Sequence, residues 1–270
     1  YFIIMILFSS WCFLKFSKEA AIGIILFSIF IYFGLTNMPW LPLILIYGLI
    51  GFKIGGLKLS ITIVASFLFI TFTGVLPQAL LSIYLCGIAV IISFILGSSL
   101  GIWAAHNDKV SAFMRPINDT MQTMPSFVIL IPFVMFFGIG EFTALLAIIA
   151  YAFVPAMRYT EHGLRNLPET VIEAARMIGC SQTQLLWKVK IPLAMPVIML
   201  GLNQTIMFGL AMLVIAALVG TTGLGQLIYI GLSKADFGTG MISGVSIALI
   251  AIIFDRTTQA WRIKLEKKTQ

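Results

Sequence analysis

The sequence predicts an all-α polytopic membrane protein, and three observations support that fold class. Apolar residues make up 60% of the 270-residue chain and charged residues only 10%, with a mean hydropathy of +1.06. A soluble domain has about 25% charged residues. The apolar residues form continuous runs without the alternation typical of transmembrane β-strands, and the basic residues lie mainly between the runs. The chain is therefore expected to be a series of helices that cross a bilayer.

The apolar runs change character along the chain. They lie at about 1–14, 20–36, 39–52, 57–73, 83–105, 119–139, 143–158, 194–219 and 241–258. From Gln78 onward the runs are longer and contain more polar groups than those before it. We therefore expect a five-span core over residues 78–258, preceded by accessory transmembrane helices in 1–77 and followed by a cytoplasmic tail, 259–270.

One long hydrophilic insert, residues 158–193, separates two of these runs. It carries five basic residues (Arg158, Arg165, Arg176, Lys188, Lys190) and three acidic ones (Glu161, Glu169, Glu173). A basic excess of this kind is typical of a loop on the cytoplasmic side. With the insert placed inside and the spans alternating, every Lys and Arg except Lys234 falls on the cytoplasmic side. This asymmetry supports both the orientation and the number of spans.

Local signals divide the insert into two helices outside the bilayer. Pro168 suits the first turn of a helix, where its missing N–H has no intrahelical partner. Gly179 suits the end of that helix, because glycine readily adopts the left-handed conformation. Ser181 and Gln184 match a capping box that would start a second, short helix, and Pro192 marks the return to apolar sequence.

The first of these helices has an apolar face formed by Val171, Ile172, Ala175 and Ile178. An apolar face on a solvated helix is typical of a docking surface. The alternative is a connecting loop with no further role, although loops of this length without a function are uncommon.

Polar side chains also occur inside the predicted spans. Gln122 opens one run, and Asn203, Gln204 and Thr205 lie together within a later one. At this depth, polar groups either hydrogen-bond between helices or line a hydrated pathway. The sequence leaves both interpretations open.

Gly97 and Gly101 lie one helical turn apart inside another span. Small residues at this spacing allow two helices to approach closely. We therefore expect a close helix contact at this position.

Nothing in the sequence indicates a catalytic, cofactor or metal site. The chain lacks the phosphate-binding pattern G-x-x-x-x-G-K-[ST], so any ATP hydrolysis must come from another subunit. His106 and His162 have no neighbouring metal ligands, and the three scattered cysteines are expected to be free thiols. Despite a net charge of +7, no stripe of basic and aromatic residues indicates nucleic-acid binding.

The insert resembles the EAA loop of ABC importer permeases. The matching residues are Glu173-Ala-Ala, three residues, Gly179, nine residues and Val189-Lys-Ile-Pro192, with Val and Ile replacing the Ile and Leu of the family pattern. In that family the first helix is a coupling helix that fits a groove on the ATPase subunit. The resemblance therefore implies that Glu173, Ala174, Ala175, Gly179 and Pro192 take part in ATPase coupling.

A wider resemblance, over about residues 38–260, is to the permease subunit of glycine betaine/proline betaine importers. Its motifs include Met121-Gln-Thr-Met-Pro125, Phe136-Phe-Gly-Ile-Gly140, Gly201-Leu-Asn-Gln-Thr205 and Asp255-Arg-Thr-Thr-Gln259. It implies a type I ABC importer in the inner membrane of a bacterium. The implied partners are a second permease copy, two cytoplasmic ATPase subunits and an extracytoplasmic binding protein that captures a quaternary ammonium osmolyte.

Two alternatives stay open at the level of sequence. The first is an ABC permease of the same architecture for another small solute, such as an amino acid or a metal chelate. The second is a secondary transporter driven by an ion gradient, which requires ionisable or unwound sites near the bilayer midplane. Most acidic residues of this chain lie at the ends of apolar runs or between them, which disfavours the second alternative.

Overall fold

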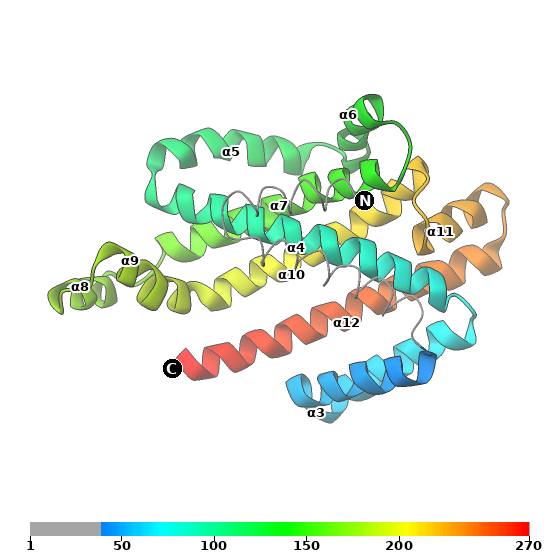
Figure 1. Cartoon of the computed structure of the whole chain (residues 1–270), viewed down its shortest axis with the longest axis horizontal. Helices are drawn as coiled ribbons and strands as arrows, with labels where there is room; N and C mark the ends of the chain where they lie inside the picture. Colours follow the sequence, from blue (N-terminus) through cyan, green and yellow to red (C-terminus); the bar gives the residue numbers. More distant parts are fainter. Residues whose placement is uncertain (1–38, 270) are drawn as a thin grey trace, which may run out of the picture.

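The computed structural model describes residues 39–269, and every regular element in that range is a helix. The predicted apolar runs at 1–14 and 20–36 lie outside the described residues. The long helices run side by side in an elongated bundle, and two short helices, α8 (Glu169–Met177) and α9 (Gln182–Gln184), stand at one end of it (Figure 1).

The centre of the bundle consists of α4 (Leu76–His106), α7 (Glu141–Arg165) and α10 (Ile191–Ala216). Leu145, Met212 and Leu213 are among the fully buried side chains there. The contact between α4 and α7 depends on glycine: a Cβ at Gly97 would lie 2.5 Å from the Phe153 carbonyl oxygen, and a Cβ at Gly101 would lie 2.6 Å from that of Met157. The close approach expected from the glycine spacing is therefore confirmed.

Helix α3 (Trp40–Phe72) folds back on itself at Gly56, whose φ of 76° favours glycine. Ser60 Oγ donates a 2.9 Å hydrogen bond to the Gly48 carbonyl, and the rings of Tyr47 and Phe67 lie 5.2 Å apart. The apolar runs at 39–52 and 57–73 are thus two antiparallel arms. Each arm has about half of the 33 residues of α3 and is about 24 Å long, which is shorter than a typical hydrocarbon core of about 30 Å.

The predicted single run at 119–139 is wrong as one continuous helix. α5 (Asp108–Thr123) and α6 (Ser126–Phe137) meet at a bend of 102°. Pro125 explains the break, because it has no N–H to donate and disfavours helical geometry at Met124, whose ψ is 133°. α5 also begins well before the apolar run, at an N-cap formed by the Asn107 side chain.

At the other end of the bundle, the segment after α10 is more helical than its glycine content suggests. A 3₁₀ turn (η2, Ala217–Val219) leads to α11 (Leu224–Ser233) and then to α12 (Phe237–Thr269). Ser82 Oγ accepts a 2.8 Å hydrogen bond from the Leu224 backbone N–H, which fixes α11 against α4. Hydrogen bonds from Thr239 lower the pKa of the Asp236 carboxyl group, which caps the start of α12.

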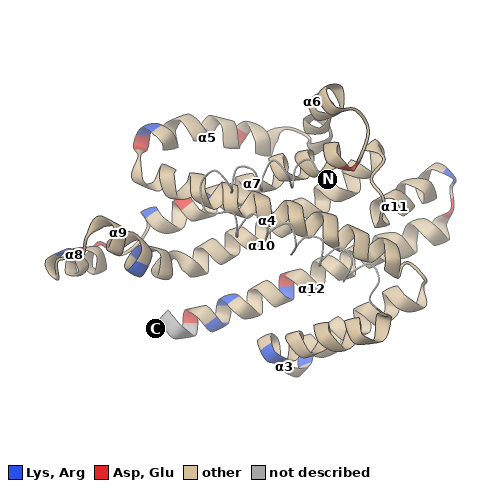
Figure 2. Cartoon of the chain, in the orientation of Figure 1, with Lys and Arg blue, Asp and Glu red and all other residues tan. Residues whose placement is uncertain are grey.

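By length and apolar composition, five helical segments of the described chain could cross a membrane, and the bent pair α5–α6 would add one more. Gln182–Val219 counts as one of the five, and so does α3 at its full 33 residues, although each of its two arms is shorter than a typical hydrocarbon core. Most Lys and Arg residues gather at the end that carries α8, α9 and the last turns of α12 (Figure 2). The turn of α3 lies at the same end, because the Lys264 Nζ donates to the Lys53 carbonyl oxygen. This arrangement agrees with the cytoplasmic side inferred from the sequence.

Candidate functional site

The hydrophilic insert begins and ends differently from the prediction. α7 continues to Arg165, so Arg158 and Glu161 belong to a membrane-spanning helix and not to the loop. The second helix of the insert is also not separate: α9 (Gln182–Gln184) passes through a π-helical turn (η1, Leu185–Lys190) directly into α10. The wider turn precedes Pro192, whose ring would crowd the carbonyl of a regular α-turn.

The first helix of the insert, α8 (Glu169–Met177), ends as the sequence predicts. Gly179 has a φ of 86°, its N–H donates to Arg176, and the N–H of Cys180 donates to Ala175, which together form a Schellman motif. Ser181 and Gln184 then form the predicted capping box, with both hydrogen bonds present. These two motifs fix the direction in which α8 leaves the bundle.

The apolar residues of α8 are divided between two faces. Ala175 is buried and Ile172 half-buried, and α8 packs against η1, whose Leu185 is also buried. Met177 and Ile178 are 89% and 83% exposed. The predicted face is therefore only partly free, and Met177 belongs to the free part although the sequence reading did not include it.

Of the expected coupling residues, Glu173, Ala174 and Gly179 are exposed on α8 and at its end, whereas Ala175 packs inward. Pro192 lies apart from them, in the first turn of α10. α8 stands clear of the long helices at the basic end of the bundle (Figures 1 and 2).

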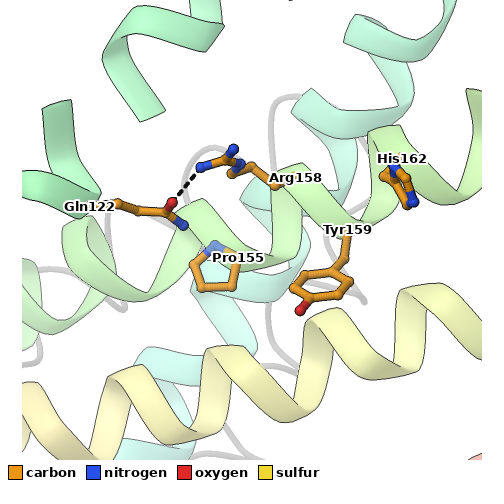
Figure 3. Close-up of a pocket in the computed structure, with 5 residues that line it drawn as sticks. All are labelled: Gln122, Pro155, Arg158, Tyr159 and His162. Atoms are coloured by element: carbon orange, nitrogen blue, oxygen red, sulfur yellow. Dashed lines mark hydrogen bonds between the residues drawn. The ribbon is translucent and has the colours of Figure 1, made fainter. Parts of the chain in front are cut away.

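A second polar site lies between α5 and α7, where the structure has a cleft of about 450 Å³. Gln122 of α5 and Pro155, Arg158, Tyr159 and His162 of α7 line it (Figure 3). Arg158 donates to Gln122 across the cleft and also forms a 3.3 Å ion pair with Asp119. Of the five residues that line this cleft, only Gln122 was among the pathway residues predicted from the sequence, which were Gln122, Asn203, Gln204 and Thr205. The sequence prediction assigned Arg158 to the loop and His162 to a cytoplasmic segment.

A neighbouring cavity of about 350 Å³ shares Arg158 and His162 with this cleft. It reaches the cytoplasmic end of α7, where Arg165 pairs with Asp108 at 2.8 Å and with Glu161 at 3.0 Å. Charges of both signs therefore line this second cavity, three arginines with Asp119 and Glu161, whereas Arg158 is the one Lys, Arg, Asp or Glu residue that lines the first cleft.

The structure does not bring the three polar residues of α10 together with Gln122. Asn203 is buried and bridges to α12, where its Nδ2 donates to Asp255 at 2.9 Å and its Oδ1 accepts from Thr258 at 2.6 Å. Thr205 is fully buried and bonds to the Gly201 carbonyl of its own helix. Gln204 is only half-buried.

The described residues 39–269 contain no group of three or more His, Cys, Asp or Glu side chains that could hold a metal ion. The candidate site has two parts, the protruding helix α8 and the polar cleft between α5 and α7. The hydrogen bonds between α10 and α12 lie outside both parts. A protruding amphipathic helix is suited to contact another protein, and a polar cleft beside a candidate membrane-spanning helix is suited to contact water or a solute.

Residues 97–262 match the family described as binding-protein-dependent transport system inner membrane component. This match covers more than half of the chain and includes α7, α8, α10 and the polar cleft. The chain belongs to this family. It is therefore a multi-pass component of the inner membrane, as the apolar runs predict.

Two similar proteins support the assignment. The chain is 40% identical over 226 residues to the glycine betaine/proline betaine transport system permease protein ProW of Escherichia coli (strain K12), which covers 84% of this chain and 64% of ProW. It is 36% identical to the glycine betaine transport system permease protein OpuAB of Bacillus subtilis (strain 168), over 88% of this chain and 83% of OpuAB. The chain thus spans less than two thirds of ProW.

A solved structure of similar fold is the inward-facing MetNI methionine ABC transporter, with a TM-score of 0.62 and 18% identity over 71% of this chain and 95% of that one. At this identity the likeness concerns the fold alone. It confirms the prediction of an all-α ABC permease fold.

The hydrogen bonds of Asn203 lead to a prediction that separates its role from that of Gln204 in this inner-membrane component. Replacing Asn203 with leucine removes both bonds of the α10–α12 seam and is expected to cost about 1–3 kcal/mol of folding free energy. Replacing the half-buried Gln204 with leucine is expected to leave the melting temperature almost unchanged. Thermal unfolding of the two purified variants measures the difference, and equal melting temperatures would contradict a structural role for Asn203.

Proposed function

We propose that this chain is the transmembrane permease subunit of an ATP-driven importer for glycine betaine, proline betaine or a related quaternary ammonium osmolyte. The observation that carries the proposal is the free face of α8, built on the EAA residues and presented at the basic end of the bundle. The two named relatives, described as permease proteins of glycine betaine/proline betaine and glycine betaine transport systems, support the choice of solute.

In this proposal, α8 is the coupling helix of a five-span core over residues 78–258, and residues 1–77 are an accessory part. Glu173, Ala174 and the exposed Met177 and Ile178 enter a groove on a separate cytoplasmic ATPase subunit. The Schellman motif at Gly179 and the helix that continues through Pro192 transmit the movement of α8 to α10. ATP hydrolysis takes place on the partner, and this chain contributes no catalytic residue.

A second copy of the chain completes the pathway. The polar face of α5, with the exposed Arg115, Asp119 and Gln122, does not suit contact with lipid. Two copies that face each other through this side enclose a hydrated route, and each copy carries one ATPase. An extracytoplasmic binding protein delivers the solute at the opposite end.

Reconstitution tests the proposed function. Proteoliposomes that contain this chain, its ATPase and its binding protein are expected to accumulate labelled glycine betaine only when ATP is present on the ATPase side. Unlabelled proline betaine should compete with the labelled solute, whereas methionine should not. Uptake driven by an ion gradient in the absence of the ATPase would instead establish a secondary transporter, and competition by methionine would indicate a permease for another solute.

A further inference from the structure

The cleft between α5 and α7 offers a cation and an aromatic ring on neighbouring residues of one helix. Arg158 presents a guanidinium group, and Tyr159, the next residue of α7, presents an aromatic ring. Figure 3 shows the Arg158 side chain directed toward Gln122 of α5 and the Tyr159 ring leaving α7 in a different direction.

Arg158 forms an ion pair with Asp119 that a carboxylate of a ligand could replace. Its partner Asp119 is 63% exposed at its side chain, Arg158 itself is 47% exposed, and their separation is 3.3 Å. Exposed ion pairs of this kind contribute little free energy. A guanidinium group has five N–H donors, so a carboxylate that enters the cleft can take the place of Asp119.

Tyr159 is held in position by the close approach of α10. A Cβ at Gly201 would lie 2.7 Å from the Tyr159 Cβ, so only glycine at this position allows α10 to pack against the base of the ring. A ring held at the wall of a cleft can bind a quaternary ammonium group through its face. Burial of methyl groups against the ring adds an apolar contribution that a smaller ammonium ion lacks.

We propose that this cleft is a binding site for the transported solute within the permease itself, with a preference for zwitterions that carry both a carboxylate and a quaternary ammonium group. Arg158 binds the carboxylate in exchange for Asp119, and the Tyr159 ring binds the ammonium group. Selection of the solute is then made twice, first by the external binding protein and again inside the membrane. This inference rests on the proposed function, because it concerns the solute of that importer.

Direct binding to the full-length chain in nanodiscs tests the site without relying on transport. Saturation-transfer difference NMR with glycine betaine is expected to show contact of the methyl protons with the protein. Arg158→Gln should weaken glycine betaine binding by about tenfold, the size of one lost charge-assisted hydrogen-bond pair. The same variant should weaken the binding of choline, which has no carboxylate for Arg158 to bind, by less than about threefold.

Tyr159→Leu should weaken the binding of both solutes, and Tyr159→Phe should retain the binding of both, since phenylalanine keeps the aromatic ring. Lys109→Gln is the matched control, because it removes an exposed cation from α5 that does not line the cleft. Equal loss of betaine and choline in Arg158→Gln, or no binding by the unmodified chain, would overturn the site. Uptake by the reconstituted importer separates the two proposals: ATP-dependent betaine uptake without binding in the cleft rejects only this inference.

Discussion

Replacing Gly179 with valine is expected to reduce ATP-driven uptake by more than about tenfold while leaving membrane insertion intact. Gly179 has a φ of 86° and donates one of the two hydrogen bonds of the Schellman motif that ends α8. A β-branched residue in this conformation costs about 1–2 kcal/mol or more, because its Cβ crowds the backbone. The chain would relieve this strain by unwinding the end of α8 or changing its direction. The measurement is uptake per permease in proteoliposomes, together with ATPase activity stimulated by the binding protein.

The matched control uses a residue that tolerates the left-handed conformation. No atom lies within 4 Å of the position that a Cβ would occupy at Gly179, so the predicted effect is conformational and not steric. Gly179→Asn is therefore expected to keep most of the uptake. If the valine and asparagine variants transported equally well, the conformation of Gly179 would have no part in coupling.

Features encoded over a few neighbouring residues could be predicted from the sequence. The end of α8 at Gly179 and the capping box at Ser181 depend on local backbone chemistry, and both occur in the structure. The two arms around Gly56 were also expected as separate apolar runs. In each case the backbone is determined locally, by the conformational freedom of glycine or by hydrogen bonds between residues three apart.

The limits of the helices were harder to predict, because hydropathy reports the environment of side chains and not the continuity of the backbone. Arg158 and Glu161 looked like loop residues, yet they extend α7 and face the polar cavities beside α5. The polar cleft was not predicted for the same reason: Arg158 and Tyr159 line a cleft with Gln122 only because α7 continues beside α5. A helical repeat of polar residues continuing beyond the apolar run would have been the available signal.

The seam between α10 and α12 illustrates the opposite difficulty. The sequence left Asn203 as either an interhelical hydrogen bond or a pathway residue, and the partner that decides its contacts, Asp255, lies 52 residues away. No local pattern connects the two. Gln204 and Thr205 share the motif with Asn203 but differ from it in burial and in hydrogen-bond partners, so neighbours in sequence do not share one role.

Replacing both Gly97 and Gly101 with alanine is expected to prevent stable packing of α4 against α7 and to remove most of the folded protein. The added Cβ atoms would lie 2.5 Å and 2.6 Å from backbone carbonyl oxygens of α7, which cannot move aside as a flexible side chain can. Overpacking of a core typically costs about 1–3 kcal/mol per site, and the two sites lie on one contact. Size-exclusion profiles and melting temperatures of the detergent-solubilised variant provide the measurement.

Gly87→Ala, on the same helix, is the control for this double substitution. No atom lies within 4 Å of a Cβ built at Gly87, so an alanine there adds no contact and replaces a glycine that disfavours helix by about 1 kcal/mol. This control is expected to melt at the same temperature as the unmodified protein or higher. If the double variant were equally stable, the helices could not lie as close as the structure places them. The groups that reach the cleft from α7, including Arg158 and Tyr159, would then occupy different positions, because they lie on the same helix as the contact with Gly97 and Gly101.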